Sequence, residues 1–172
     1  MKSPGITVRP LVDMTGDWHF CEVFMDGVRV PKSALIGQKN RGWYQIASQL
    51  DYERSGIERL MSNYPLFRGL VNWAKETERD GKPLSRHPLV RRELADLEVQ
   101  FEVGKLLIYR VAWLLSKGIV PNYEAALAKA YSTDFEQRLA NAAINIQGLY
   151  GQLKRDSKWA RLRGMGVKVY LY

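Results

Sequence analysis

The 172-residue chain carries 26 Lys and Arg against 18 Asp and Glu, a formal net charge of +8, and 46% of its residues are hydrophobic. This composition is typical of a globular protein with one core, and no run approaches the ~18 apolar residues of a membrane-spanning helix. The single cysteine, Cys21, excludes an internal disulfide and fits a reducing compartment, so we expect a cytoplasmic location without a membrane partner. The basic charge favours anionic partners such as nucleic acid or a phosphate-bearing cofactor, although a solvated basic surface explains it equally well.

The first thirty residues predict short β-strands. Residues 6–12 and 18–24 have strand-like composition, and the turn-rich segment 13–17 separates them. Asp26-Gly27 is a two-residue hairpin signal that predicts a third strand over Val28–Val30. Because three short strands cannot form a stable sheet with a core of its own, they indicate the last strands of a larger β-domain.

From Gly42 onward, apolar residues at three- and four-residue steps predict long helices. The first runs from about residue 42 to 75, and Pro65 inside it predicts either a kink near Met61–Tyr64 or a break into two helices. The second and third helices run from about 88 to 117 and from about 122 to 147.

The last part of the chain is predicted to be less regular. A fourth, shorter helical segment begins at Arg155, and Gly164-Met165-Gly166 interrupts it. The final stretch, Val167–Tyr172, is apolar and β-branched and is compatible with either a strand or a helix.

Few residues of the chain suit a metal or nucleophilic site. Only His19 and His87 accompany the one cysteine, no spacing fits zinc, and no glycine-rich phosphate loop is present, so we predict no metal site. Glu53 is the notable acid, because it lies one helical turn from Leu50 and Ile57, on or beside the apolar stripe. It is either a structural carboxylate, paired for example with a neighbouring arginine, or a catalytic base.

The stretch from Val30 to Arg54 contains an ordered set of motifs. A strand ends in Val30-Pro31, the loop Leu35-Ile36-Gly37 leads to Gly42-Trp43, and the helix then carries Leu50-x-x-Glu53-Arg54. This set resembles the junction in acyl-CoA dehydrogenases where the β-domain meets the C-terminal helical domain. The resemblance implies a mainly α fold, an up-and-down helical bundle preceded by a small β-strand remnant. It assigns residues 1–36 to the terminal strands of the β-domain and residues 37–172 to a C-terminal helical-bundle domain that is incomplete at its C-terminus.

The resemblance implies part of an FAD-dependent enzyme that converts an acyl-CoA thioester to a trans-2-enoyl-CoA. A thioester α-proton is weakly acidic, so its base must be a carboxylate made more basic by a dry pocket. Glu53 matches the helical base of the isovaleryl-CoA and long-chain branches, whereas most of the family takes its base from a segment beyond the end of this chain. Arg54 matches the arginine that organises the pocket, and Asp51 falls where some members keep an acid near bound CoA.

Two FAD motifs of the family are matched in part. The family's Arg-x-x-Phe-Gly corresponds to residues 77–81, where Arg79 is the candidate to replace the missing cation. The family's Gln-x-x-Gly-Gly-x-Gly keeps Gly148 and Gly151 and has Asn145 in place of Gln, with Gln147 as an alternative amide. Both motifs face the FAD of a neighbouring subunit in the family, so the resemblance implies a homo-oligomer or mixed oligomer, with electron-transfer flavoprotein as the electron acceptor. We do not expect the chain to hold FAD alone.

Two other functions remain open. The altered FAD motifs suit a non-catalytic oligomerisation domain or subunit of such an enzyme. A basic helical module that binds nucleic acid is the less favoured reading, because neither an aromatic–basic pattern nor helix-turn-helix spacing supports it.

Overall fold

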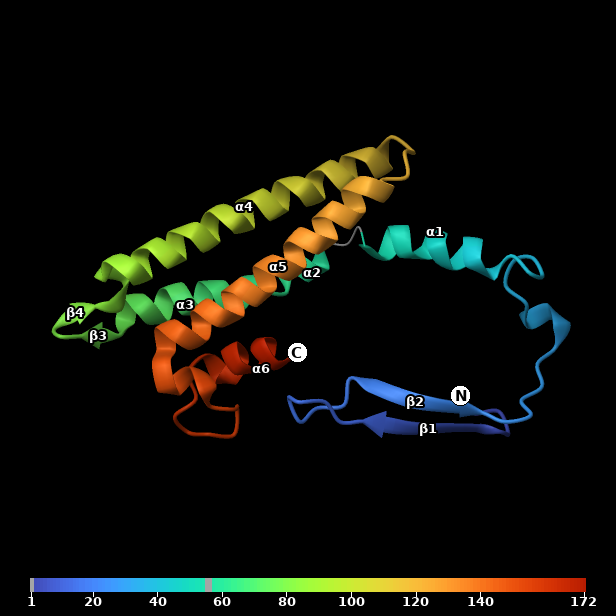
Figure 1. The fold of residues 1–172 in the computed structure, drawn as a ribbon, viewed down its shortest axis with the longest axis horizontal. Helices are drawn as coiled ribbons and strands as arrows, with labels where there is room; N and C mark the ends of the chain where they lie inside the picture. The colour runs from blue at the N-terminus through green and yellow to red at the C-terminus, as the bar shows by residue number, and fades with distance from the viewer. Residues whose placement is uncertain (1, 55–56) are drawn as a thin grey trace. The chain divides into compact units, whose positions relative to one another are not determined.

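The computed structural model describes residues 2–54 and 57–172, without the side chain of Asp51, and it divides into two compact units. Met1–Ala47 with Leu171–Tyr172 form one, called here the N-terminal unit, and Ser48–Tyr170 form the other, called the helical unit. The chain is mainly helical, as predicted (Figure 1). None of the helices in the described residues is both long and apolar enough to cross a membrane.

Two antiparallel strands, β1 (Ile6–Leu11) and β2 (Phe20–Met25), form the sheet of the N-terminal unit. The loop between them is closed by Asp13, whose carboxylate accepts hydrogen bonds from the backbone N–H and the hydroxyl of Thr15. The hydroxyl contact holds the pKa of Asp13 below its ordinary value. The predicted hairpin at Asp26-Gly27 is wrong, because the Asp26 N–H donates to the Gly5 carbonyl at 2.9 Å and β2 pairs with β1 instead.

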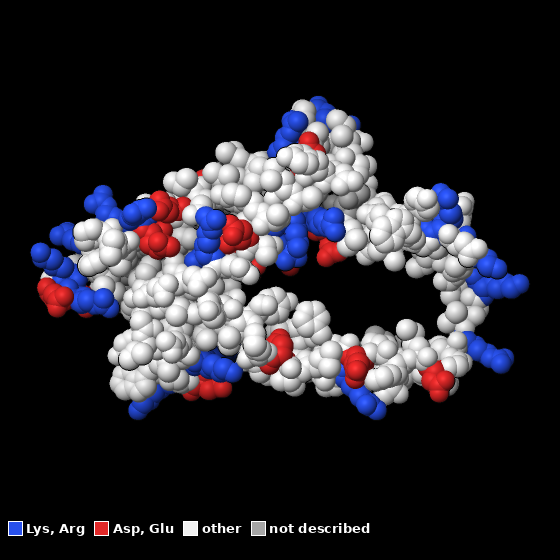
Figure 2. All heavy atoms as spheres, viewed as in Figure 1, with Lys and Arg blue, Asp and Glu red and all other residues white. Residues whose placement is uncertain are grey.

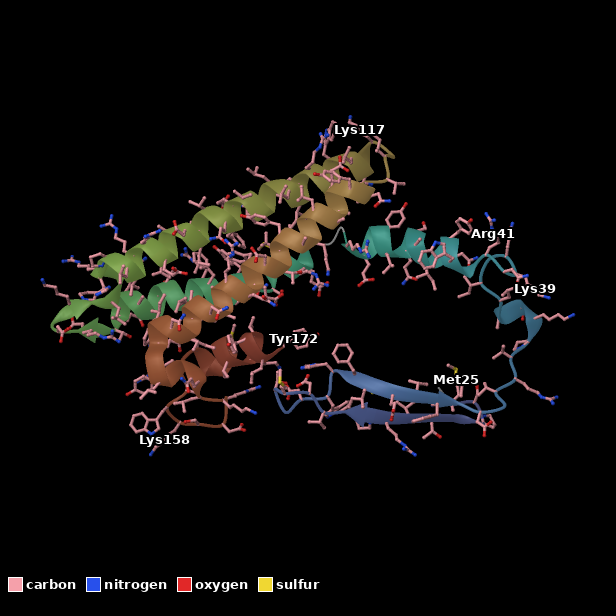
Figure 3. All side chains as sticks on the ribbon, viewed as in Figure 1. Met25, Lys39, Arg41, Lys117, Lys158 and Tyr172 are labelled. Carbon is pink, nitrogen blue, oxygen red and sulfur yellow. The ribbon has the colours of Figure 1, made fainter. Side chains whose placement is uncertain are left out.

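The sheet has an apolar face that no described residue covers. Since side chains alternate along a strand, Ile6, Val8 and Pro10 share a face with their cross-strand partners Met25, Val23 and Cys21. The side chain of Met25, labelled in Figure 3, is 72% exposed, and β2 is exposed along its whole length. These strands therefore bury no core of their own. The short 3₁₀ turn η1 (Lys32–Ala34) leads on toward the first helix.

The predicted first helix is divided into α1 (Gly42–Arg54), α2 (Glu58–Met61) and α3 (Tyr64–Glu76). The break predicted near Met61–Tyr64 is confirmed, because Pro65 occupies the first turn of α3, where a missing N–H breaks no helical bond. Between α1 and α2, Ile57 lies in a turn, and residues 55–56 lie outside the described residues.

The two long helices have the predicted bounds within a residue: α4 (Pro88–Ser116) and α5 (Asn122–Gln147). The strands β3 (Glu78–Arg79) and β4 (Lys82–Pro83) and the turn η2 (Leu84–Arg86) connect α3 to α4. The α4–α5 loop carries Lys117 at its outer edge (Figure 3). The core lies among α2, α3, α4 and α5 and contains Leu60, Leu66, Phe67, Leu70, Leu97, Phe101, Ile108, Val111, Phe135 and Leu139.

The helix predicted from Arg155 is wrong. After the turn η3 (Gly148–Gln152) the chain is irregular, and η4 (Arg161–Gly164) then leads into α6 (Met165–Leu171). Leu162, Arg163 and Gly164 have φ of 50°, 55° and 66°, so the backbone turns left-handed just before α6 begins. Leu162 packs over Gly69 of α3, where a Cβ would lie 3.2 Å from its side chain. The apolar end of the chain is therefore a helix, and the glycines predicted to interrupt it lie at its start.

The contact between α5 and α6 contains one unusual side chain, Gln147. It is 4% exposed, and neither of its amide atoms has a hydrogen-bond partner among the described residues. A Cβ at Gly166 would lie 3.6 Å from its Nε2 and 3.4 Å from the Ala143 side chain, so the amide is enclosed by apolar groups of α5 and α6. A buried amide without partners lowers stability.

Replacing this amide with a thioether of similar length should stabilise the helical unit. We expect Gln147→Met to raise the free energy of unfolding by roughly 1 kcal/mol, because the unpaired polar atoms are removed without a change of shape. Chemical denaturation measures the effect, and Gln137→Met, at an exposed position of the same helix, is the matched control. A loss of stability would show instead that the amide has a bonding partner that these residues do not supply.

Candidate functional site

Glu53, the candidate base, lies in the last turn of α1, and its side chain is exposed. It forms no ion pair with Arg54 or Arg59 among the described residues, so the paired structural carboxylate considered from the sequence is not observed. The side chain of Asp51 lies outside the described residues. Within the part of the chain that the structure describes, Glu53 is thus an exposed carboxylate without an ion pair.

The apolar stripe of α1 is largely exposed in the described residues. Trp43 and Ile46 are 79% and 58% exposed, and Leu50 is only half-buried. An exposed carboxylate lacks the desolvation that strengthens a base. In the described residues, Glu53 and the apolar side chains of α1 are therefore exposed to solvent.

Arg79, the candidate cation for FAD, lies at the tip of the β3–β4 hairpin. Asp80 and Gly81 form its two-residue turn with φ of 54° and 73°, and this turn places Arg79 directly opposite Lys82. Like charges opposite each other across two strands are unfavourable, and an anion would relieve the repulsion. Lys82 was missed from the sequence, although the Asp-Gly pair between the two cations is a hairpin signal that places them opposite each other.

The second FAD motif lies where α5 ends, at the same end of the helical unit as β3 and β4 (Figure 1). Gly148 has a φ of 61°, which favours glycine, and no atom lies within 4 Å of a Cβ built there. Gly151 serves close packing, since a Cβ there would lie 2.7 Å from the backbone of Ile144. The two glycines thus have different roles, one at an open turn and one at a close approach.

The two candidate amides of this motif differ in position. Asn145 is exposed, whereas Gln147 is enclosed in the contact between α5 and α6. An amide that reaches the cofactor of a neighbouring subunit must face outward, and Asn145 meets that requirement. Arg79, Lys82 and Asn145 are thus exposed polar groups at this end of the helical unit, and two of them are cations.

The described residues contain no group of three or more His, Cys, Asp or Glu that could hold a metal ion.

Comparison with known proteins identifies the family of this chain. Residues 40–168, most of the chain, match the family model described as "Acyl-CoA dehydrogenase, C-terminal domain". The probable acyl-CoA dehydrogenase YngJ of Bacillus subtilis is 29% identical over 157 residues, covering 88% of this chain and 41% of that protein. The cyclohexane-1-carbonyl-CoA dehydrogenase of Syntrophus aciditrophicus is 30% identical over 155 residues, covering 87% of this chain and 40% of that protein.

The fold agrees with these relatives. A chain of the ChsE4-ChsE5 complex from Mycobacterium tuberculosis superposes with a TM-score of 0.84 at 26% identity, covering 98% of this chain and 43% of that one. The chain spans about two fifths of the length of these proteins. From its matched domain and its fold, the chain belongs to the acyl-CoA dehydrogenase family and contains that family's C-terminal helical domain.

Proposed function

We propose that this chain is the helical part of an FAD-dependent acyl-CoA dehydrogenase, an enzyme that converts an acyl-CoA thioester to a trans-2-enoyl-CoA. The observation that supports the proposal most directly is Glu53, an unpaired carboxylate at the end of α1, in a chain whose domain matches this family. The relatives' names also describe acyl-CoA dehydrogenases or a dehydrogenase of a CoA thioester.

Glu53 has the role of the base in this proposal. Its carboxylate takes the α-proton of the thioester as the C–H bond breaks. Bound FAD would supply the acceptor for the hydride that leaves the β-carbon. Covering the apolar stripe of α1 with the rest of the enzyme excludes water from Glu53 and raises its basicity. Arg54, next in sequence, supplies a fixed positive charge that organises the pocket, and Asp51 lies on the same helix to contact the CoA part of the substrate.

The second part of the proposal concerns the cofactor and partners. The family resemblance implies that Arg79, Asn145 and Gly148 face the FAD of a neighbouring subunit, and their exposure on the helical unit is compatible with this role. Such a site requires a homo-oligomer or a mixed oligomer, and the ChsE4-ChsE5 relative is itself described as a complex. Electron-transfer flavoprotein is the proposed acceptor of the electrons, and we retain the cytoplasmic location expected from the sequence.

The cofactor proposal predicts a difference between the chain alone and its assembly. We expect the purified 172-residue chain to show no flavin absorption after incubation with FAD and removal of the excess, because its FAD-facing groups form only an outer edge of the site. Flavin should be retained when the remaining domains or a homologous partner chain are added. Tight FAD binding by the chain alone would contradict this division of the site.

The catalytic proposal is tested by Glu53→Gln in the flavin-containing assembly. We expect acyl-CoA turnover to fall by about 10²–10⁴-fold, because the variant keeps the shape of the side chain but cannot take a proton. Flavin absorption and acyl-CoA binding should be retained. The matched control is Glu58→Gln, a carboxylate in the first turn of α2 that should leave turnover unchanged. Near-normal turnover of Glu53→Gln would exclude Glu53 as the base.

A further inference from the structure

The loop that leads into α6 concentrates much of the positive charge of the chain. Residues 153–164, called here the basic loop, contain five Lys and Arg and one acid, Asp156, so they carry half of the formal net charge of +8. The five cations are all exposed, and they are Lys154, Arg155, Lys158, Arg161 and Arg163. Figure 2 shows blue side chains projecting from this part of the helical unit, at the lower left. The proposed dehydrogenase chemistry uses none of them.

The basic loop is closed at its base and attached to the helical unit. At Gly164 a Cβ would lie 2.7 Å from the backbone nitrogen of Arg155 and 3.0 Å from the carbonyl oxygen of Leu153, so the two ends of the loop touch. Leu162 packs over Gly69 and attaches the same end of the loop to α3. Compact surface loops whose ends lie close together frequently have a function. The side chains of this loop are therefore presented from a fixed base.

Two aromatic rings lie beneath cations of the basic loop. The Lys158 Nζ is 5.3 Å from the centre of the Trp159 ring, and the guanidinium carbon of Arg161 is 5.2 Å from the centre of the Tyr150 ring. Trp159 is still 55% exposed. Lys158 projects from the outer edge of the loop (Figure 3). The loop thus presents an exposed indole beside a cation at its outer edge.

We propose that the basic loop binds the surface of a membrane that contains anionic phospholipids. Its cations contact the lipid phosphates, and the Trp159 indole enters the interfacial layer, where tryptophan rings are enriched. Clusters of about four to eight Lys and Arg recognise anionic lipids in this way, because each cation adds to the attraction. Such a contact is peripheral and requires no membrane-spanning helix. The inference therefore revises the expectation that the chain has no membrane partner.

Single-stranded nucleic acid fits the basic loop less well. Binding of that kind uses a row of aromatic rings on which successive bases stack. Here one face of the Trp159 ring and one face of the Tyr150 ring already lie against a cation. A lipid surface needs phosphate contacts and a ring in the interfacial layer, rather than a row of open ring faces. The arrangement therefore favours lipid, and the inference does not depend on the dehydrogenase chemistry.

Vesicle co-sedimentation of the purified 172-residue chain tests the inference. We expect binding to phosphatidylcholine vesicles that contain about 30% phosphatidylglycerol, and at least about tenfold weaker binding to pure phosphatidylcholine, because only the mixed vesicles are negatively charged. Raising the salt concentration from about 0.1 M to about 0.5 M should release the chain, because the Debye length falls from about 10 Å to about 4 Å. The neutral vesicles also measure any association through the exposed apolar residues of α1.

A pair of charge reversals locates the contact on the chain. Arg155→Glu combined with Lys158→Glu should weaken binding to the mixed vesicles at least about tenfold, because two attractive charges become repulsive. The matched control is Lys32→Glu combined with Lys39→Glu, which makes the same change of net charge at two other exposed positions. The control should weaken binding less than about twofold, because salt screens charges that do not reach the lipid surface. Circular dichroism checks that both variants fold.

Removing the one acid of the basic loop should have the opposite effect. Asp156→Asn should strengthen binding to the mixed vesicles about two- to threefold, because a repulsive charge is lost. Glu93→Gln, at an exposed position of α4, makes the same change of charge and should leave binding unchanged. Trp159→Ala should weaken binding about three- to tenfold, because it removes the indole from the interfacial layer.

Four results would overturn the inference. They are equal binding to neutral and anionic vesicles, equal weakening by the two pairs of charge reversals, no gain from Asp156→Asn, and tighter binding to a thymidine oligonucleotide than to the mixed vesicles. The last result would identify the loop as a nucleic-acid site instead. None of these results bears on Glu53, whose role is decided separately by turnover.

Discussion

The contact between α4 and α5 holds the helical unit together. The rings of Phe101 and Phe135 meet across it with centroids 5.9 Å apart, and Tyr64 and Phe67 extend this aromatic cluster toward α3. At Gly104 a Cβ would lie only 3.1 Å from the side chain of Leu60, so the glycine lets α2 approach α4 closely. Helices α2 and α3 pack against this pair.

Around that core, the features linked to function all lie at exposed surfaces. Glu53 and the apolar stripe of α1, the cations Arg79 and Lys82, and the amide of Asn145 all lack a covering layer within the described chain. A dehydrogenase site needs the opposite, a closed pocket in which charge is poorly solvated. The proposed function therefore requires that these side chains are enclosed by groups other than the described residues.

Helix α4 has two apolar faces. One face forms the core, whereas the other carries exposed apolar side chains such as Val99, Leu106 and Trp113. An exposed apolar face of this kind is typical of a surface that packs against another element.

The residue ranges of α4 and α5 follow from local sequence patterns, because the helical periodicity of both is long. Pro88 marks the start of α4 and Gly148 the end of α5. The break before Pro65 also follows from the sequence, because proline lacks a backbone N–H and disrupts the helix at its own position. Three other features of the structure depend on tertiary contacts, which local sequence patterns do not reveal. β2 pairs with β1 rather than across Asp26-Gly27, the left-handed turn at Leu162–Gly164 is held against Gly69, and Gln147 is buried while Asn145 is exposed. Each of these depends on residues distant in sequence, whose contacts outweigh local preference.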